Sequence, residues 1–100
     1  MDRYKVGISP RAKRELEEIY KYIALEKQAP ENAKGQTDRI KNAILGLAIF
    51  PQSHQDRLVG AYVGKGYKQL LIDNYTAIYK IDEMKKIVTV VTIQYQGRNV

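Results

Sequence analysis

The spacing of the apolar residues changes near Pro51, and this change constrains the fold more than any other feature of the sequence. Before that proline, apolar and small residues recur every three or four positions, which is the period of a helix with one buried face. Beyond residue 66 the period is two, which is typical of β-strands. A chain of 100 residues is too short for two separate cores, so the helices and strands must share one. We therefore predict a single domain, residues 1–100, of the α+β class.

The N-terminal half predicts one short strand followed by a helical hairpin. Residues 3–9 alternate between apolar and other side chains, as a strand does. Ser9 and Pro10 then predict the beginning of a helix, with Ser9 as its N-cap and Pro10 as its first residue. The apolar stripe of this helix continues to Ile23, residues 27–31 interrupt it, and a second helix extends to the proline where the period changes. Two helices joined by so few residues form an antiparallel hairpin.

The C-terminal half predicts three antiparallel strands, Tyr67–Ile72, Tyr75–Ile81 and Ile87–Tyr95. Asp73-Asn74 forms a tight turn between the first two, and residues 82–86 form a longer turn before the third. The third strand is apolar on both faces, which places it inside the sheet rather than at an edge. The predicted fold is an N-terminal strand, a two-helix hairpin and a three-stranded antiparallel meander, with the helices packed on one face of the sheet.

Composition limits the classes of function. The chain has 17 basic and 11 acidic residues, a net charge of +6, which favours polyanionic partners such as nucleic acid, a nucleoprotein particle or an acidic protein. It has no cysteine and one histidine, so we expect no metal site and no cofactor. No segment approaches the roughly 20 apolar residues that span a bilayer, and the N-terminus lacks the apolar region of a signal peptide. We expect a cytoplasmic protein that does not bind membranes.

Four segments carry a resemblance to a known family. Ile8–Ala12 reads I-S-P-R-A and is followed by the helical pattern of Leu16–Ile23; the second helix, Asp38–Pro51, closes on L-A-I-F-P. Tyr75–Asp82 and Val90–Asn99 supply two strand patterns. In this order the segments resemble the RelE/ParE superfamily of toxins from type II toxin–antitoxin systems. The N-terminal half is closer to the ParE type.

The resemblance implies a toxin that causes growth arrest and is held inactive in a hetero-oligomer with a cognate acidic antitoxin. ParE-type members are associated with poisoning DNA gyrase, whereas RelE-type members enter the ribosomal A site and cut mRNA. We favour inhibition of gyrase. A ribosome-dependent mRNA endonuclease is the alternative, in which case the chain is an endoribonuclease, and a non-toxic α+β nucleic-acid-binding domain is the second alternative.

Two departures from the RelE-type pattern bear on this choice. Thr76 occupies the position where RelE-type nucleases carry a catalytic arginine, and Tyr95 the position where many members have histidine. RNA cleavage needs an activated 2′-hydroxyl, a stabilised phosphate charge and a protonated leaving oxygen. Because threonine cannot supply the positive charge, we expect mRNA cleavage to be weak unless Lys65 or Lys68 takes that role.

The candidate site residues are few. Arg98, Tyr95 and Lys68 are candidate catalytic groups, and Lys65, Lys68 and Arg98 are candidate ligands for nucleic acid or another target. Arg98 follows the last strand, where its guanidinium could hold a phosphate with two hydrogen bonds; the alternative is a solvated chain end. Lys68 follows a tyrosine, as a nuclease-site lysine does in RelE-type toxins, but Leu70 replaces that site's second lysine. Tyr95 fits two roles equally well from the sequence: its ring can stack on a nucleic-acid base, or it can cover the end of the core.

Overall fold

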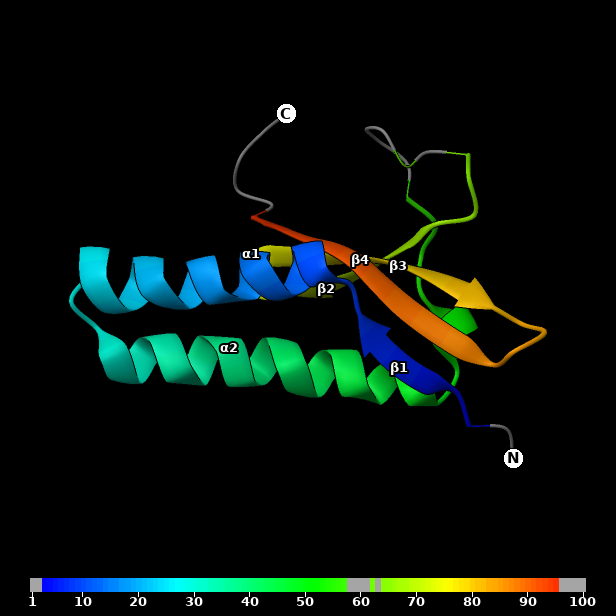
Figure 1. Ribbon diagram of the computed structural model, residues 1–100, viewed down its shortest axis with the longest axis horizontal. Coiled ribbons are helices and arrows are strands. Elements are labelled where there is room, and N and C mark those ends of the chain that lie inside the picture. Colours follow the sequence, from blue (N-terminus) through cyan, green and yellow to red (C-terminus); the bar gives the residue numbers. More distant parts are fainter. Residues whose placement is uncertain (1–2, 58–61, 63, 96–100) are drawn as a thin grey trace.

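Two antiparallel helices cover one face of a four-stranded sheet (Figure 1). The computed structural model describes residues 3–57, 62 and 64–95. The elements are β1 (Lys5–Ile8), α1 (Pro10–Lys21), the π-helix η1 (Tyr22–Glu26), α2 (Pro30–Leu45), the 3₁₀-helices η2 (Gly46–Ala48) and η3 (Pro51–Ser53), β2 (Lys68–Ile72), β3 (Tyr75–Asp82) and β4 (Ile87–Tyr95). The predicted fold class and order of elements are confirmed. In the described part of the chain, no helix is long and apolar enough to cross a membrane.

The strands lie in the order β1-β4-β3-β2. β2 pairs with β3 and β3 with β4 in antiparallel fashion, as the predicted meander requires. β4 lies inside the sheet, which confirms the prediction from its apolar faces. Its other neighbour is β1, and this pair is parallel, with Lys5 opposite Ile87 and Ile8 opposite Val90. The parallel pairing was not predicted, because residue spacing in one strand carries no information about the direction of its neighbour.

α1 begins as the sequence predicts and ends differently. The Ser9 hydroxyl accepts a hydrogen bond from the Ala12 amide at 3.0 Å, so Ser9 is the N-cap, and Pro10 is the first helical residue. The regular α-helix stops at Lys21, and the chain continues as one wide turn of π-helix, in which the Lys27 amide bonds the Tyr22 carbonyl. The predicted apolar stripe to Ile23 therefore spans two helix types, which side-chain spacing alone does not distinguish.

α2 also ends earlier than predicted. It stops at Leu45, and Gly46–Ala48 tightens into a 3₁₀ turn before Pro51. A glycine weakens the α-helix at this point, and 3₁₀ turns are common at helix ends.

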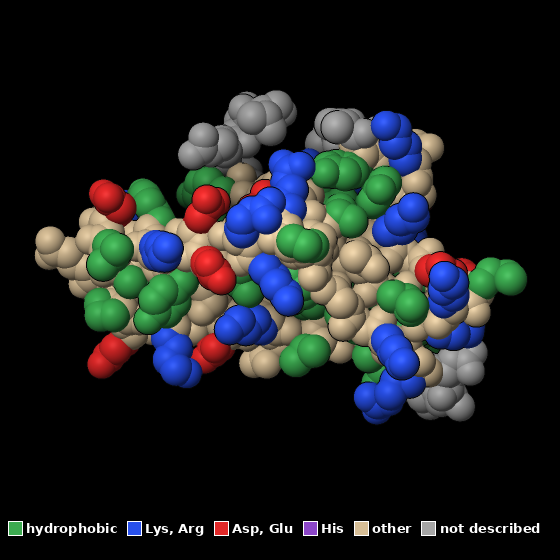
Figure 2. All heavy atoms as spheres, in the orientation of Figure 1, with side chains coloured by type: hydrophobic (Ala, Val, Ile, Leu, Met, Phe, Trp, Pro, Cys, Tyr) green, Lys and Arg blue, Asp and Glu red, His purple; other side chains and the backbone are tan. Residues whose placement is uncertain are grey.

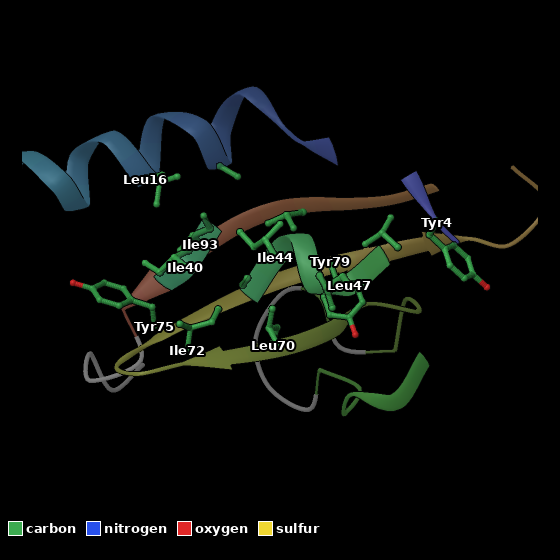
Figure 3. Packing of buried hydrophobic residues seen from close by; sticks show 14 residues of the cluster. Tyr4, Leu16, Ile40, Ile44, Leu47, Leu70, Ile72, Tyr75, Tyr79 and Ile93 are labelled. Carbon is green, nitrogen blue, oxygen red and sulfur yellow. The ribbon is translucent and has the colours of Figure 1, made fainter. Parts of the chain in front are cut away.

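The core lies between the helices and the sheet (Figure 3). Leu16 of α1 and Ile40 and Ile44 of α2 pack on the sheet residues, of which Tyr79 is completely buried. The Tyr79 hydroxyl donates a hydrogen bond to the Pro51 carbonyl at 2.5 Å. Burial raises the pKa of Tyr79, so its phenol stays protonated and this bond fixes the segment after α2 to the sheet.

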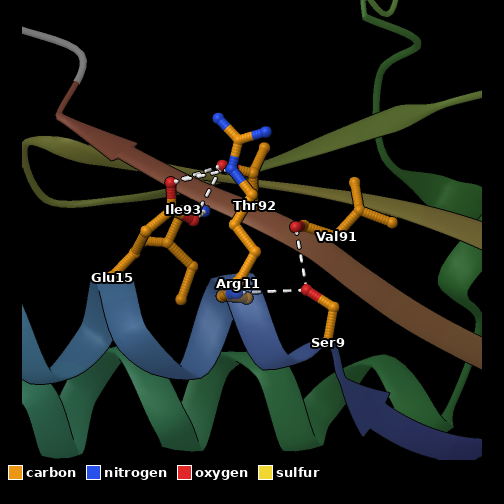
Figure 4. A network of polar contacts seen from close by, with 7 residues as sticks. Ser9, Arg11, Glu15, Val91, Thr92 and Ile93 are labelled. Atoms are coloured by element: carbon orange, nitrogen blue, oxygen red, sulfur yellow. Dashed lines mark hydrogen bonds and ion pairs between the residues drawn. The ribbon is translucent and has the colours of Figure 1, made fainter.

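α1 completes the edge of β4 that β1 leaves uncovered (Figures 1 and 4). β1 pairs only as far as Val90. Beyond it, the Ser9 hydroxyl donates to the Val91 carbonyl at 2.9 Å. The Glu15 carboxylate accepts from the Ile93 amide at 2.9 Å and from the Thr92 hydroxyl at 2.8 and 2.9 Å. The Glu15 side chain of the helix thus accepts the backbone hydrogen bond that a carbonyl of a neighbouring strand would otherwise accept.

The first prediction concerns this carboxylate. Glu15→Ala should lower the free energy of unfolding by about 1–3 kcal/mol, because the Ile93 amide loses a charged acceptor in a partly buried position. Urea denaturation measures the change. Glu18→Ala, at an exposed position of the same helix, is the matched control and should change stability by less than about 0.5 kcal/mol. Equal losses in the two variants would mean that the edge contact contributes nothing of its own.

Candidate functional site

The predicted site residues are dispersed over the second half of the chain. Lys65 is exposed in the turn that precedes β2, Lys68 begins β2 and Tyr95 ends β4. Arg98 lies outside the described residues.

Lys68 is held by the segment that runs beside it. Its ammonium donates to the Asp56 carboxylate at 2.8 Å and to the His54 carbonyl at 3.1 Å, and its side chain is 22% exposed. Asp56 also forms a β-bridge with Lys68, and the Gln69 amide bonds the Gln55 carbonyl at 2.9 Å. Lys68 therefore fastens residues 54–57 to the outer edge of β2, whatever further role it has.

Tyr95 belongs to a cluster of three tyrosines. It lies opposite Tyr75 in the β3–β4 register, with ring centroids 5.5 Å apart. Burial raises the pKa of Tyr75, and the neighbouring phenols of Tyr95 and Tyr22 add to this effect. Tyr22 and Tyr95 are 52% and 49% exposed, whereas Tyr75 is 9% exposed, so the cluster has a buried base and an accessible rim.

The structure does not bring Lys68 and Tyr95 together. Lys68 lies opposite Tyr79, whereas Tyr95 lies opposite Tyr75. These two positions are four residues apart in β3, which is roughly 13 Å along a strand. The Lys68 ammonium is in addition bound by Asp56 and the His54 carbonyl, along the edge of β2 that faces away from β3.

Thr76 lies on the face of the sheet that points away from the helices. We call this the outer face; its strand positions are Gln69 and Leu71 of β2, Thr76, Ile78 and Lys80 of β3, and Thr89, Thr92 and Gln94 of β4. Along each strand these positions alternate with core residues such as Leu70, Ala77 and Ile93. Thr76 is 2% exposed, so its small neutral side chain is part of the floor of this face.

Arg57, which is not among the predicted site residues, lies on the same face. Its guanidinium donates to the Gln69 side-chain oxygen at 2.9 Å and to that of Gln94 at 3.5 Å. These glutamines belong to β2 and β4, the two neighbours of β3. The guanidinium must therefore lie across β3, above Thr76 and Ile78. Nothing in the spacing of residues marks Arg57, because its place depends on how an irregular segment folds back along β2.

A groove lies on the other side of the molecule, between α1, α2 and β1 (Figure 2). Its volume is about 570 Å³. Its lining is apolar below and charged at the rim: Val6, Ile8, Leu16, Tyr20, Thr37, Ile44 and Leu45, with Lys13, Glu17, Lys21 and Lys41. The rim has three lysines and one glutamate, so its net charge is positive. The groove therefore suits an amphipathic segment of a partner whose apolar side chains are flanked by acidic ones.

The described residues offer no cluster of three or more histidine or carboxylate side chains that could bind a metal ion.

The sequence model described as "ParE toxin of type II toxin-antitoxin system, parDE" matches residues 6–100. No curated protein is significantly similar to the sequence.

Three solved structures share the fold. A chain of the chromosomal ParDE toxin–antitoxin system from P. aeruginosa is similar with a TM-score of 0.73 and 18% identity, over 92% of this chain and 95% of that chain. A chain of the RelBE2 toxin–antitoxin complex from Mycobacterium tuberculosis is similar with a TM-score of 0.65 and 18% identity, over 95% of this chain and 93% of that chain. A chain of the archaeal RelE–RelB complex from Pyrococcus horikoshii is similar with a TM-score of 0.66 and 17% identity, over 95% of this chain and 97% of that chain. At such identities the likeness concerns the fold.

Proposed function

Because the chain belongs to the ParE family of toxins from type II toxin–antitoxin systems, we propose that it arrests growth by binding and inhibiting DNA gyrase. The observation that carries this choice over mRNA cleavage is the separation of the candidate acid–base groups. Lys68 lies opposite Tyr79, in the middle of β3, and Tyr95 lies opposite Tyr75, at its start. General acid–base catalysis needs its groups within hydrogen-bond reach of one reacting centre.

Thr76 supports the same choice. It is neutral and 2% exposed, so it offers no charge to a phosphate. Removal of one preorganised charge from an active site costs roughly 3–4 kcal/mol of barrier. Inhibition by binding requires no such group.

A second candidate function is cleavage of mRNA on the ribosome. One observation favours it: Arg57 lies across the same face as Thr76, with its guanidinium held by Gln69 and Gln94. An arginine supplied by a loop can take the place of one supplied by a strand. The acid and base that would complete such a site are still unassigned.

We also propose that an acidic antitoxin holds the toxin inactive by placing an amphipathic helix in the groove between α1 and α2. The three structural neighbours are components of toxin–antitoxin systems or complexes. The groove offers an apolar floor and three rim lysines. Apolar side chains at helical spacing would fill the floor, and flanking carboxylates would face the lysines.

The target prediction is tested with two assays on the purified toxin. We expect inhibition of gyrase supercoiling with accumulation of cleaved DNA, and no codon-specific cleavage of mRNA on programmed ribosomes. Efficient mRNA cleavage with unaffected gyrase would contradict the gyrase proposal and favour the second candidate.

The groove prediction uses charge reversal. Lys41→Glu should weaken antitoxin binding by roughly five- to tenfold, because an attractive rim contact becomes repulsive. Calorimetry or surface plasmon resonance measures the affinity. The matched control is Lys85→Glu, the same change at an exposed turn position outside the groove, which should have little effect. Equal weakening in both variants would mean that only the net charge of the toxin matters, and it would contradict the proposal that the antitoxin binds in the groove.

The Arg98 prediction separates recognition from folding. Arg98→Ala should relieve growth arrest and leave the melting temperature within about 2 °C of the parent, because the role proposed for this arginine is recognition and not packing. Expression in a host without the antitoxin measures the first effect and calorimetry the second. Full toxicity would assign Arg98 to the solvated surface, and loss of folding would make it structural.

A further inference from the structure

We propose that Glu17 determines which partner the groove between α1 and α2 accepts. The partner's helix must place a basic residue against Glu17, between two acidic residues that face Lys13 and Lys21. This inference rests on the proposal that an antitoxin helix occupies the groove, and it adds a defined order of charges to that helix. A helix with acidic residues alone at these positions fits less well, although the rim as a whole is positive.

The charges on the α1 side of the groove alternate in sign. Lys13, Glu17 and Lys21 all line the groove, at intervals of four residues. Four residues of an α-helix rise about 6 Å, so the three charges form a row about 12 Å long. The opposite wall contributes Lys41 of α2. Among the described residues that line the groove, Glu17 is the one carboxylate, so it alone favours a basic residue of the partner.

The four charged groups of the rim are available to a partner. All four side chains are exposed, and no hydrogen bond or ion pair joins their charged groups to another described residue. Lys34 and Asp38 of α2 have the same spacing and do form an ion pair, with a distance of 2.9 Å. Glu15 of α1 is occupied as well, because it bonds the edge of β4 and faces Arg11. Glu17 is therefore a carboxylate that the fold itself does not use.

The apolar floor beside this row makes a helix the better occupant. Leu16 and Tyr20 of α1 lie directly before two of the charged residues and line the same groove, together with Ile44 of α2. A helix that carries charges at i, i+4 and i+8 can carry apolar residues at i+3 and i+7 on the adjoining stripe. An extended strand matches the same charge spacing only with every side chain of one face, which leaves none for the apolar floor.

The order of charges provides specificity because a wrong residue acts in two ways. An acidic residue opposite Glu17 removes an attractive contact and adds a repulsive one. Exposed ion pairs contribute little each, equivalent to roughly two- to fivefold in affinity. The groove thus discriminates between helices of the same composition by the position of one basic residue.

The test uses two amphipathic helical peptides of about 18 residues, or five turns, with the same composition. The matched peptide has Glu, Lys and Glu at i, i+4 and i+8 beside its apolar stripe, and a further Glu on its solvent side. In the exchanged peptide the Lys and the further Glu trade places, so the net charge is unchanged. Fluorescence anisotropy with the full chain should show the matched peptide bound about threefold more tightly.

Three variants assign this preference to one carboxylate. Glu17→Lys should reverse it, so that the exchanged peptide binds about threefold more tightly, and Glu17→Gln should abolish it, because the charge is gone. The matched control is Glu18→Lys, which makes the same change of charge at an exposed position of α1 that does not line the groove. It should keep the preference of the wild type.

Equal affinity of the two peptides for the wild-type chain, failure of both to bind, or a preference that Glu17→Lys leaves unchanged overturns the proposal. Reversal in Glu18→Lys overturns it too, as does circular dichroism that shows the bound peptide extended. If Glu17→Lys does not fold, Glu17→Gln decides. Should Lys41→Glu still weaken antitoxin binding, only the charge order fails; should it have no effect, the groove itself is not the antitoxin site.

Discussion

β4 has to satisfy backbone hydrogen bonds along both edges, and the remaining elements are arranged around that requirement. One edge pairs with β3 over its whole length. The other pairs with β1 only up to Val90, after which Ser9 and Glu15 of the following helix take over. The position of α1 is therefore set by hydrogen bonds as well as by apolar packing. α2 then covers the rest of the same sheet face through Ile40 and Ile44.

The sequence contained what was needed to predict the elements and little of what was needed to predict the site. Periodicity indicated the helices and strands, and Ser9 with Pro10 indicated the start of α1 correctly. These signals are local, so they do not depend on the rest of the fold. The parallel β1–β4 pair and the location of Arg57 arise only from contacts between distant segments. Lys68 looked like a site residue by its neighbours in sequence, and in the structure it binds Asp56.

The two surfaces considered for function lie on opposite sides of the sheet, and α1 touches both. Leu16 lines the groove, while the adjacent Glu15 holds the end of β4, beside the outer face. A partner that shifts α1 from the groove side would act on the hydrogen bonds that Glu15 makes with Thr92 and Ile93 of β4. Such a partner could influence the outer face without covering it, since helices and strands transmit small displacements as rigid bodies.

The pairing of β1 with β4 also has a consequence for the synthesis of the protein. The Ser9 hydroxyl bonds a carbonyl that lies 82 positions further along the chain. β1 thus waits for β4, and the sheet cannot close before the residues up to the end of β4 have left the ribosome. Contacts between such distant segments slow folding, because a long loop must be closed before any of them forms. Newly made chains consequently pass through a period in which the segments of both helices have been made and the finished sheet has not yet formed.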